Sequence, residues 1–94
     1  MGCINSGGLT VSKVVNTNRS KLVSVHATAV DDTLFTFSIW DSANTTTSGK
    51  KEMLRMNLKG VAVNHECDMH GALALDGLYY EVTAGAGFVT VNYA

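Results

Sequence analysis

One nine-residue stretch, Thr33 to Asp41 (TLFTFSIWD), constrains the fold more than any other. Within it Phe35, Phe37 and Ile39 alternate with other side chains, which is the two-residue period of a β-strand with one buried face. Aromatic and β-branched residues suit the pleated surface of a sheet and fit a helix poorly. The stretch therefore predicts the central strand of the domain, with its three alternating apolar residues facing the core. Trp40 falls on the opposite side.

Five further segments show the same alternation, and they span residues 21–30, 51–59, 61–67, 78–83 and 88–93. In 51–59, Leu54 and Leu58 are also spaced as on a helix, but the neighbouring segments are strands and we predict a strand there too. The chain has no proline, so its nine glycines mark the turns. Together the six segments predict an all-β fold, a small antiparallel β-sandwich or jelly-roll-like barrel of about six strands.

Short connections predict two antiparallel hairpins. Only Asp31-Asp32 separates 21–30 from the central strand, and the glycine-rich residues 84–87 separate 78–83 from 88–93. We therefore expect the two strands of each pair to lie side by side in one sheet. In the last segment the alternation places Val89 and Val91 in the core.

The first twenty residues differ from the rest of the chain because they are poor in bulky apolar groups and contain Gly7-Gly8. They predict an N-terminal arm, residues 1–20, with at most one short strand between Leu9 and Val15. Residues 21–94 are then the single β domain, which suits a chain of 94 residues.

The beginning of the chain also fits an acylation pattern, with Gly2 after the initiator methionine, Ser6 at the sixth position and Cys3 beside it. That alternative would make the protein a lipid-anchored adaptor, whereas we expect no membrane contact. Two cysteines, Cys3 and Cys67, are too few for a disulfide framework, and the sequence shows no signal peptide. We therefore expect reduced thiols and synthesis in a cytoplasm.

Charge is divided unevenly along the chain. All seven Lys and Arg residues lie before residue 60 together with four acids, which gives residues 1–60 a net charge of +3. The other four acids follow without any Lys or Arg, so residues 61–94 carry −4. Either the two parts pair within one fold, or they are complementary between subunits. Because the bases are few and separated by acids, we expect no nucleic-acid binding.

The sequence contains only weak matches to motifs for metal binding or catalysis. His65, Cys67 and His70 are the best candidates for zinc ligands, since zinc binds imidazole and thiolate, but their spacing matches no usual zinc motif. No nucleophile elbow, phosphate-binding loop or carboxylate pair accompanies them. We therefore predict no enzyme activity, no catalytic residues, and no metal or cofactor.

Partner contacts are expected instead from basic residues outside the predicted core and from two aromatic residues, since Trp and Arg are enriched at protein interfaces. These candidate contacts are Lys13, Arg19, Trp40, Lys50, Lys51, Arg55 and Tyr79.

Two runs, FSIWDSA and the terminal LDGLYYEVTAGAGFVTVNY, resemble the small β-structured virion proteins of tailed bacteriophages. In those proteins a strand ending in Trp-Asp is followed by a terminal glycine-punctuated hairpin. The likeness covers roughly residues 20–94, the N-terminal arm has no counterpart, and the apolar residues 73–75 depart from the pattern. The matching residues are Trp40, Asp41, Gly77, Leu78, Tyr80, Val82, Gly85, Gly87, Val89, Val91 and Tyr93.

The resemblance implies a non-enzymatic structural virion protein, made in the host cytoplasm. Its implied role is that of a capsid decoration (cement) protein that binds and stabilises the outside of the phage head. It would do so through its β body and its N-terminal arm, which lies across the major capsid protein or other virion proteins. The uneven charge adds the expectation of a homo-oligomer, with a trimer favoured. The alternatives are a tail or neck component, or a host-attachment module that binds carbohydrate through Trp40, Tyr79 and the polar loop 42–49.

Overall fold

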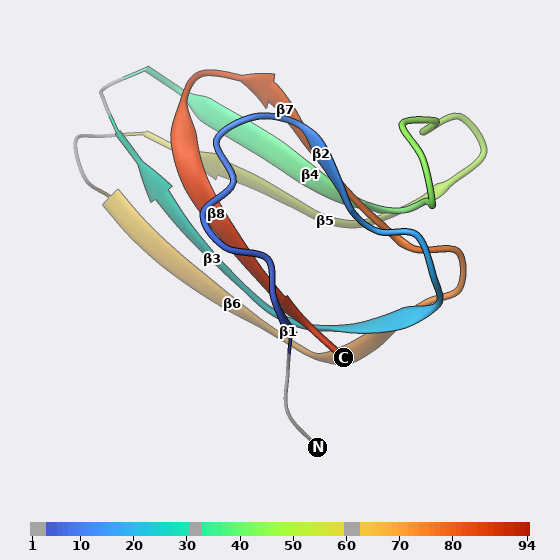
Figure 1. Ribbon diagram of the computed structural model, residues 1–94. Coiled ribbons are helices and arrows are strands. Elements are labelled where there is room, and N and C mark those ends of the chain that lie inside the picture. The colour runs from blue at the N-terminus through green and yellow to red at the C-terminus, as the bar shows by residue number, and fades with distance from the viewer. Residues whose placement is uncertain (1–3, 31–32, 60–62) are drawn as a thin grey trace.

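The computed structural model describes residues 4–30, 33–59 and 63–94, and these residues form strands joined by turns and loops, without a helix (Figure 1). The predicted turn at Asp31-Asp32, the start of the predicted strand 61–67, and Gly2 and Cys3 lie outside the described residues. The strands are β1 (Ile4–Asn5), β2 (Lys13–Asn16), β3 (Ser20–Ala29), β4 (Phe35–Asp41), β5 (Lys51–Leu58), β6 (Val63–Ala74), β7 (Leu78–Ala84) and β8 (Gly87–Tyr93).

Two four-stranded antiparallel sheets face each other. Sheet I has the order β1-β8-β3-β6, and sheet II has the order β2-β7-β4-β5. The chain pairs with itself in a nested way, since β1 pairs with β8, β2 with β7, β3 with β6 and β4 with β5. This is the strand pattern of a jelly roll, so the predicted fold class is confirmed. The described residues contain eight strands, where the sequence predicted about six.

The core lies between the two sheets. Phe35, Phe37 and Ile39 of β4 are at most 1% exposed, which confirms the predicted register of the central strand. Val89 and Val91 of β8 face them from sheet I and are fully buried, as predicted. The predicted strand at 51–59 is also confirmed, because β5 pairs with β4 along its length and buries alternate residues in the same core.

Both predicted hairpins are wrong. The strands β3 and β4 belong to different sheets, and so do β7 and β8. Alternation specifies which face of a strand is buried but not which strand lies beside it, so a short connection can cross the sandwich as readily as it can turn within one sheet. The crossing from β7 to β8 runs so close to β4 that a side chain at Gly85 would meet the backbone of Leu34.

A β-bulge explains a smaller difference in β3. Unbroken alternation along the predicted strand 21–30 would place Val23 and Val25 on one face, but the structure buries Leu22 and Val25 and leaves Val23 only half-buried. The register of the pairing with β6 shifts between Leu22 and Ser24. The extra residue at this bulge changes which alternate side chains point into the core. On β6 the irregularity includes His70, a non-glycine residue with a positive φ of 52°.

The expected N-terminal arm is part of the sandwich, which corrects the predicted domain division at residue 20. Strand β1 extends sheet I and β2 extends sheet II. Between them Leu9 is 5% exposed, belongs to the core, and exchanges two backbone hydrogen bonds of 2.7 and 3.0 Å with Val89. The segment needs few apolar residues, because most of the core side chains come from the other strands and it covers only one side of that core.

Replacement of Phe37, whose phenyl ring is buried in the core, tests the register of β4. Phe37→Ala should lower the free energy of unfolding by about 3–5 kcal/mol, because it leaves a cavity between the sheets. Phe88→Ala is the matched control, since Phe88 is 51% exposed on β8, and it should change stability by about 0.5 kcal/mol or less. Urea unfolding followed by circular dichroism measures both values, and similar losses for the two variants would show that the register is wrong.

The sheet-crossing turn gives a second prediction. Gly85 and Gly49 share the same left-handed backbone, with φ of 74°, but a Cβ at Gly85 would meet Leu34 whereas one at Gly49 would meet nothing within 4 Å. Gly49→Ala should therefore cost only the backbone strain, about 1 kcal/mol. Gly85→Ala should cost clearly more in the same unfolding assay. Equal costs would contradict the close crossing of β7 to β8.

Candidate protein-binding surfaces

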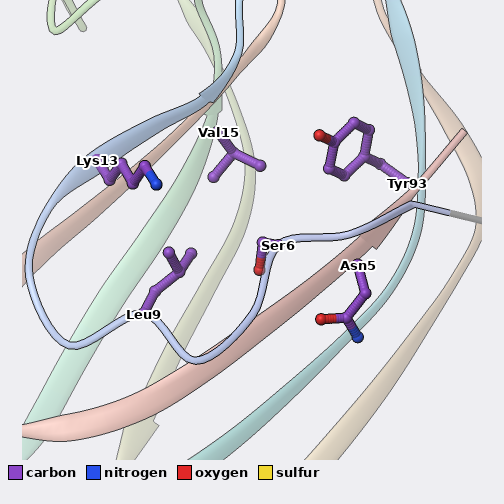
Figure 2. A pocket seen from close by; sticks show the side chains of 6 residues that line it. All are labelled: Asn5, Ser6, Leu9, Lys13, Val15 and Tyr93. Carbon is purple, nitrogen blue, oxygen red and sulfur yellow. The ribbon is translucent and has the colours of Figure 1, made fainter.

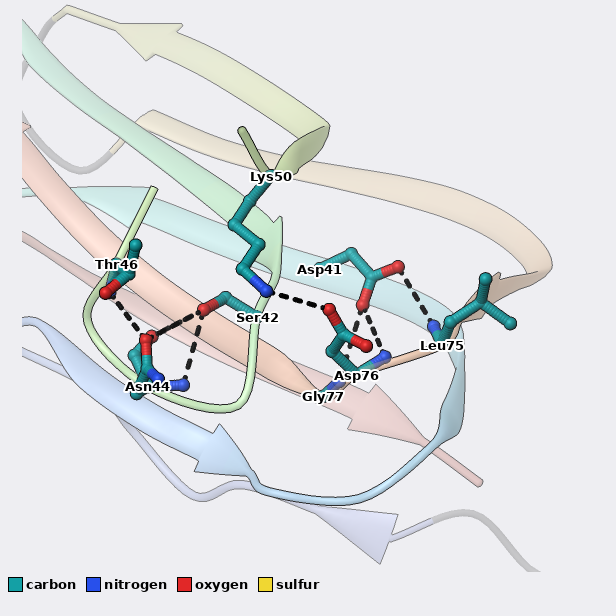
Figure 3. A network of polar contacts seen from close by, with 8 residues as sticks. All are labelled: Asp41, Ser42, Asn44, Thr46, Lys50, Leu75, Asp76 and Gly77. Carbon is teal, nitrogen blue, oxygen red and sulfur yellow. Dashed lines mark hydrogen bonds and ion pairs between the residues drawn. The ribbon is translucent and has the colours of Figure 1, made fainter. Parts of the chain in front are cut away.

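One end of the sandwich is held together by Asp41, the last residue of β4 (Figure 3). Its Oδ2 accepts a hydrogen bond of 2.9 Å from the backbone N–H of Leu75, and its Oδ1 accepts bonds of 2.8 and 3.4 Å from those of Asp76 and Gly77. The Asp41 side chain is thus the acceptor for three N–H groups in the turn between β6 and β7. This carboxylate ties sheet II to the connection that arrives from sheet I.

The environment of Asp41 also sets its protonation. Burial by itself raises the pKa of this carboxyl, but the three backbone N–H groups and the nearby Lys50 ammonium outweigh burial and lower the pKa below its ordinary value of 3.8. Asp41 is therefore ionised at neutral pH, and its hydrogen bonds are charge-assisted.

Lys50, a predicted partner contact, is already engaged within the chain. Its Nζ lies 3.0 Å from Oδ2 of Asp76, so it joins the end of loop 42–50 to the β6–β7 turn (Figure 3). The loop is also held by its own polar groups, since Ser42 Oγ donates to the carbonyl oxygen of Asn44 at 2.8 Å and Asn44 Oδ1 accepts from the N–H of Thr46 at 2.8 Å. The loop end of the molecule is thus a hydrogen-bonded unit.

The two predicted aromatic contacts lie on the outer face of sheet II. Tyr79 of β7 has Val14 of β2 and Trp40 of β4 as its cross-strand neighbours, so the three side chains form a row across the sheet. Tyr79 is only 6% exposed, and Trp40 is half-buried and donates from Nε1 to Glu81 Oε1 at 3.3 Å. The structure therefore brings these two aromatic residues together and largely covers one of them.

Strand β5 carries the next two predicted contacts. Arg55 pairs with Glu52 at 3.1 Å, and Glu52 also accepts a hydrogen bond of 2.7 Å from Ser38 Oγ. Lys51 is exposed and has no ion pair with any described residue. Of the two cations on β5, Arg55 is thus paired within the chain, whereas Lys51 has no ion pair with a described residue.

Arg19 lies in the turn before β3, where it lines an open groove of about 270 Å³ together with Lys21, Leu73 and Ala94. Neither cation has a carboxylate partner among the residues that the structure describes. Leu73 is 40% exposed beside them. The groove therefore combines positive charge with exposed apolar surface.

Lys13 lies on the opposite side of sheet II from β5 and lines a notch between the two sheets (Figure 2). We call this space of about 170 Å³ the N-terminal notch, and its lining residues are Asn5, Ser6, Leu9, Lys13, Val15 and Tyr93. Leu9 and Val15 pack against the core, whereas the Lys13 ammonium and the Tyr93 hydroxyl bond to no described residue. Lys13 was a predicted partner contact, and that role stays a prediction. The sequence did not indicate that Tyr93 lies in the same notch, because β1 and β2 are too short to show which side chains meet there.

The uneven charge is only slightly neutralised inside the fold. Among the described residues, Lys50 and Asp76 form the one ion pair between a Lys or Arg of the basic part and an acid of the part 61–94. Apart from Asp41, which binds backbone N–H groups, the charged residues without an ion pair to a Lys, Arg, Asp or Glu of the described chain are Lys13, Arg19, Lys21, Lys51, Lys59, Glu66, Asp68 and Glu81. Pairing within the fold therefore accounts for little of the charge division.

The candidate zinc ligands do not come together with a further ligand. His65 and Cys67 lie on β6, and Cys67 has a free thiol 3.7 Å from the sulfur of Met69. His70 lies in the irregular part of the strand, and its backbone N–H donates to Asp68 Oδ1 at 2.8 Å. Within residues 4–30, 33–59 and 63–94, no three His, Cys, Asp or Glu side chains are placed to hold a metal ion. The prediction that metal has no role stays a prediction.

No model of a known protein family, no curated protein and no solved structure matches this chain. The described residues include no helix with the length and apolar character needed to cross a membrane. What the fold and its surfaces define is a small jelly-roll domain with unpaired charges on its outside.

The role of Asp41 gives a prediction with a defined pH dependence. Asp41→Asn should lower stability by about 1–3 kcal/mol at pH 7, because it removes the charge and turns one acceptor into a donor facing backbone N–H groups. The folded-state pKa of Asp41 is lowered, so its contribution is fully present above 3.8 and is lost as the pH falls through the lower folded-state value. The difference between wild type and variant should disappear over the same range.

Asp76→Asn is the control for this measurement. Asp76 is 51% exposed and pairs only with Lys50, so the screened pair should contribute less than about 1 kcal/mol. Unfolding free energies from pH 2 to pH 7 compare the two variants. Equal losses, or an Asp41→Asn loss that persists in acid, would contradict the assignment.

Proposed function

We propose that this protein is a non-enzymatic structural component of a virion, acting as a decoration (cement) protein that binds the outside of a phage head as a homo-oligomer. The observation that carries the proposal is the charge distribution. A rigid β-body presents unpaired cations from residues 1–60 and unpaired acids from residues 61–94, and a single ion pair joins the two parts within the described chain. Such surfaces favour defined partners and orientations.

The fold suits this role because it offers a compact body with short connections. Nearly all large side chains of the inner faces are buried, so binding falls to the outer faces, the edges and the ends of the sandwich. Protein interfaces of this kind act through buried area and complementary charge and require no catalytic group. The unpaired Arg19, Lys21 and Lys51 are the cations best placed to meet a capsid protein.

Placement on a phage head is supported by the resemblance of roughly residues 20–94 to small virion proteins. Two of the matching glycines have structural reasons here, since a side chain at Gly77 would meet the backbone of Asn16 and one at Gly85 would meet that of Leu34. The terminal segment of the resemblance is a crossing between sheets in this chain, and not a hairpin. The likeness is therefore one of sequence pattern, and it does not extend to the pairing of the last two strands.

A free arm that reaches across the capsid is not part of the proposal. Residues 4–16 pair with β7 and β8 and place Leu9 in the core, so removing them would damage the body. The carbohydrate-binding alternative needs exposed aromatic residues, and Tyr79 is largely covered. A tail or neck location is an outcome of the test below.

Location in the particle tests the proposal. Antibodies raised against the full-length protein should label the heads of the phage that encodes it in electron micrographs. After heads and tails are separated, the protein should remain with the heads in many copies, as judged by quantitative mass spectrometry. Recovery with tails would replace the cement role by a tail or neck role, and absence from purified particles would overturn the virion assignment.

A further inference from the structure

The N-terminal notch has the chemistry of a site for a carboxylate. Asn5 and Ser6 are committed within the chain, since Asn5 Oδ1 accepts from the N–H of Gly7 at 2.7 Å and Ser6 Oγ accepts from the N–H of Val91 at 2.8 Å. The Lys13 ammonium and the Tyr93 hydroxyl remain as donors without partners in the described chain. In Figure 2, the amine of Lys13 points toward the space between Leu9 and Ser6.

The size of the notch limits what can enter it. Its volume of about 170 Å³ suits a single side chain, and the surface that it offers is mostly polar. A carboxylate that enters the notch beside Lys13 would meet its exposed ammonium, which gives a charge-assisted hydrogen bond. The expected occupant is therefore an acidic side chain from a protein surface.

An unpaired acidic side chain lies on the other side of the sandwich. Strand β6 is the edge of sheet I opposite β1, and it carries Glu66 and Asp68. Asp68 is engaged by the backbone N–H of His70, whereas Glu66 is exposed and bonds to no described residue. One side of each molecule thus carries a cationic notch, and the opposite side carries a free carboxylate.

We propose that copies of this chain assemble head to tail, with Glu66 of one copy entering the N-terminal notch of the next and pairing with Lys13. The two surfaces differ, so the contact is head to tail. Repeated contacts form a ring in which every copy uses both surfaces when the rotation between copies closes, and an open filament when it does not. The inference rests on the proposed homo-oligomeric function and names the contact that holds the oligomer together.

Charge reversal tests the contact in the full-length protein. Lys13→Glu and Glu66→Lys should each raise the dissociation constant of the oligomer about tenfold or more, because each places like charges together. The double variant restores opposite charges, so it should recover most of the assembly. Sedimentation velocity measures the mass of each species, and circular dichroism checks that each variant keeps its β-structure.

Lys59→Glu is the matched control, since it makes the same charge change at an exposed residue directly after β5, away from the notch, and it should assemble like wild type. The proposal is overturned if wild type is monomeric at every concentration, if the single variants assemble normally, or if the double variant does not recover. Lys13→Glu that loses head binding without a change in oligomer mass also overturns it, since the acid then comes from another virion protein.

The outcomes separate this contact from the proposed function. If the protein labels phage heads but charge reversal leaves its assembly unchanged, the virion role holds and the Lys13–Glu66 contact is wrong. If charge reversal and rescue behave as expected but the protein is absent from purified particles, the contact holds and the virion role is wrong.

Discussion

The structure depends on burying one face of β4 against the opposite sheet. Phe35 and Phe37 stack at a centroid distance of 5.3 Å, and Phe37 contacts the ring of Tyr80 at 5.5 Å, so a continuous aromatic layer fills the space between the sheets. Each such ring contributes about 1.5–3 kcal/mol when it leaves water, which is large for a domain of this size. This packing also requires a glycine at position 85, because the chain crosses between the sheets so close to the start of β4 that a Cβ there would meet the backbone of Leu34.

The same strand couples the core to the surface. Where the apolar alternation of β4 ends, Asp41 binds the turn between β6 and β7, so the strand that centres the core also fixes one end of the sandwich. Trp40 then necessarily faces outward, where its indole N–H meets Glu81. Burial also raises the pKa of Tyr80, whose hydroxyl bonds to no described residue, so this ring stays neutral within the aromatic layer.

Because the inner faces are filled, recognition belongs to the outside of the molecule. The nested strand order places β1 and β2 on one side of the sandwich and β5 and β6 on the other. This separation keeps the notch of Lys13 away from Glu66 of the same chain, so the two groups are available to other molecules. This arrangement is the structural basis of the proposed role in an assembly.

The sequence by itself determined the fold class and the inward faces of β4 and β8, because alternation along a strand depends only on local backbone geometry. It also predicted the strand at 51–59. Only the tertiary structure decided which strands lie side by side, since Val89 presents the same alternation whether its neighbour is β3 or β7. It also decided that Leu9 closes the core and that Tyr93 joins Lys13, because strands of two and four residues are too short for a periodic pattern and acquire their positions only by pairing with strands distant in sequence.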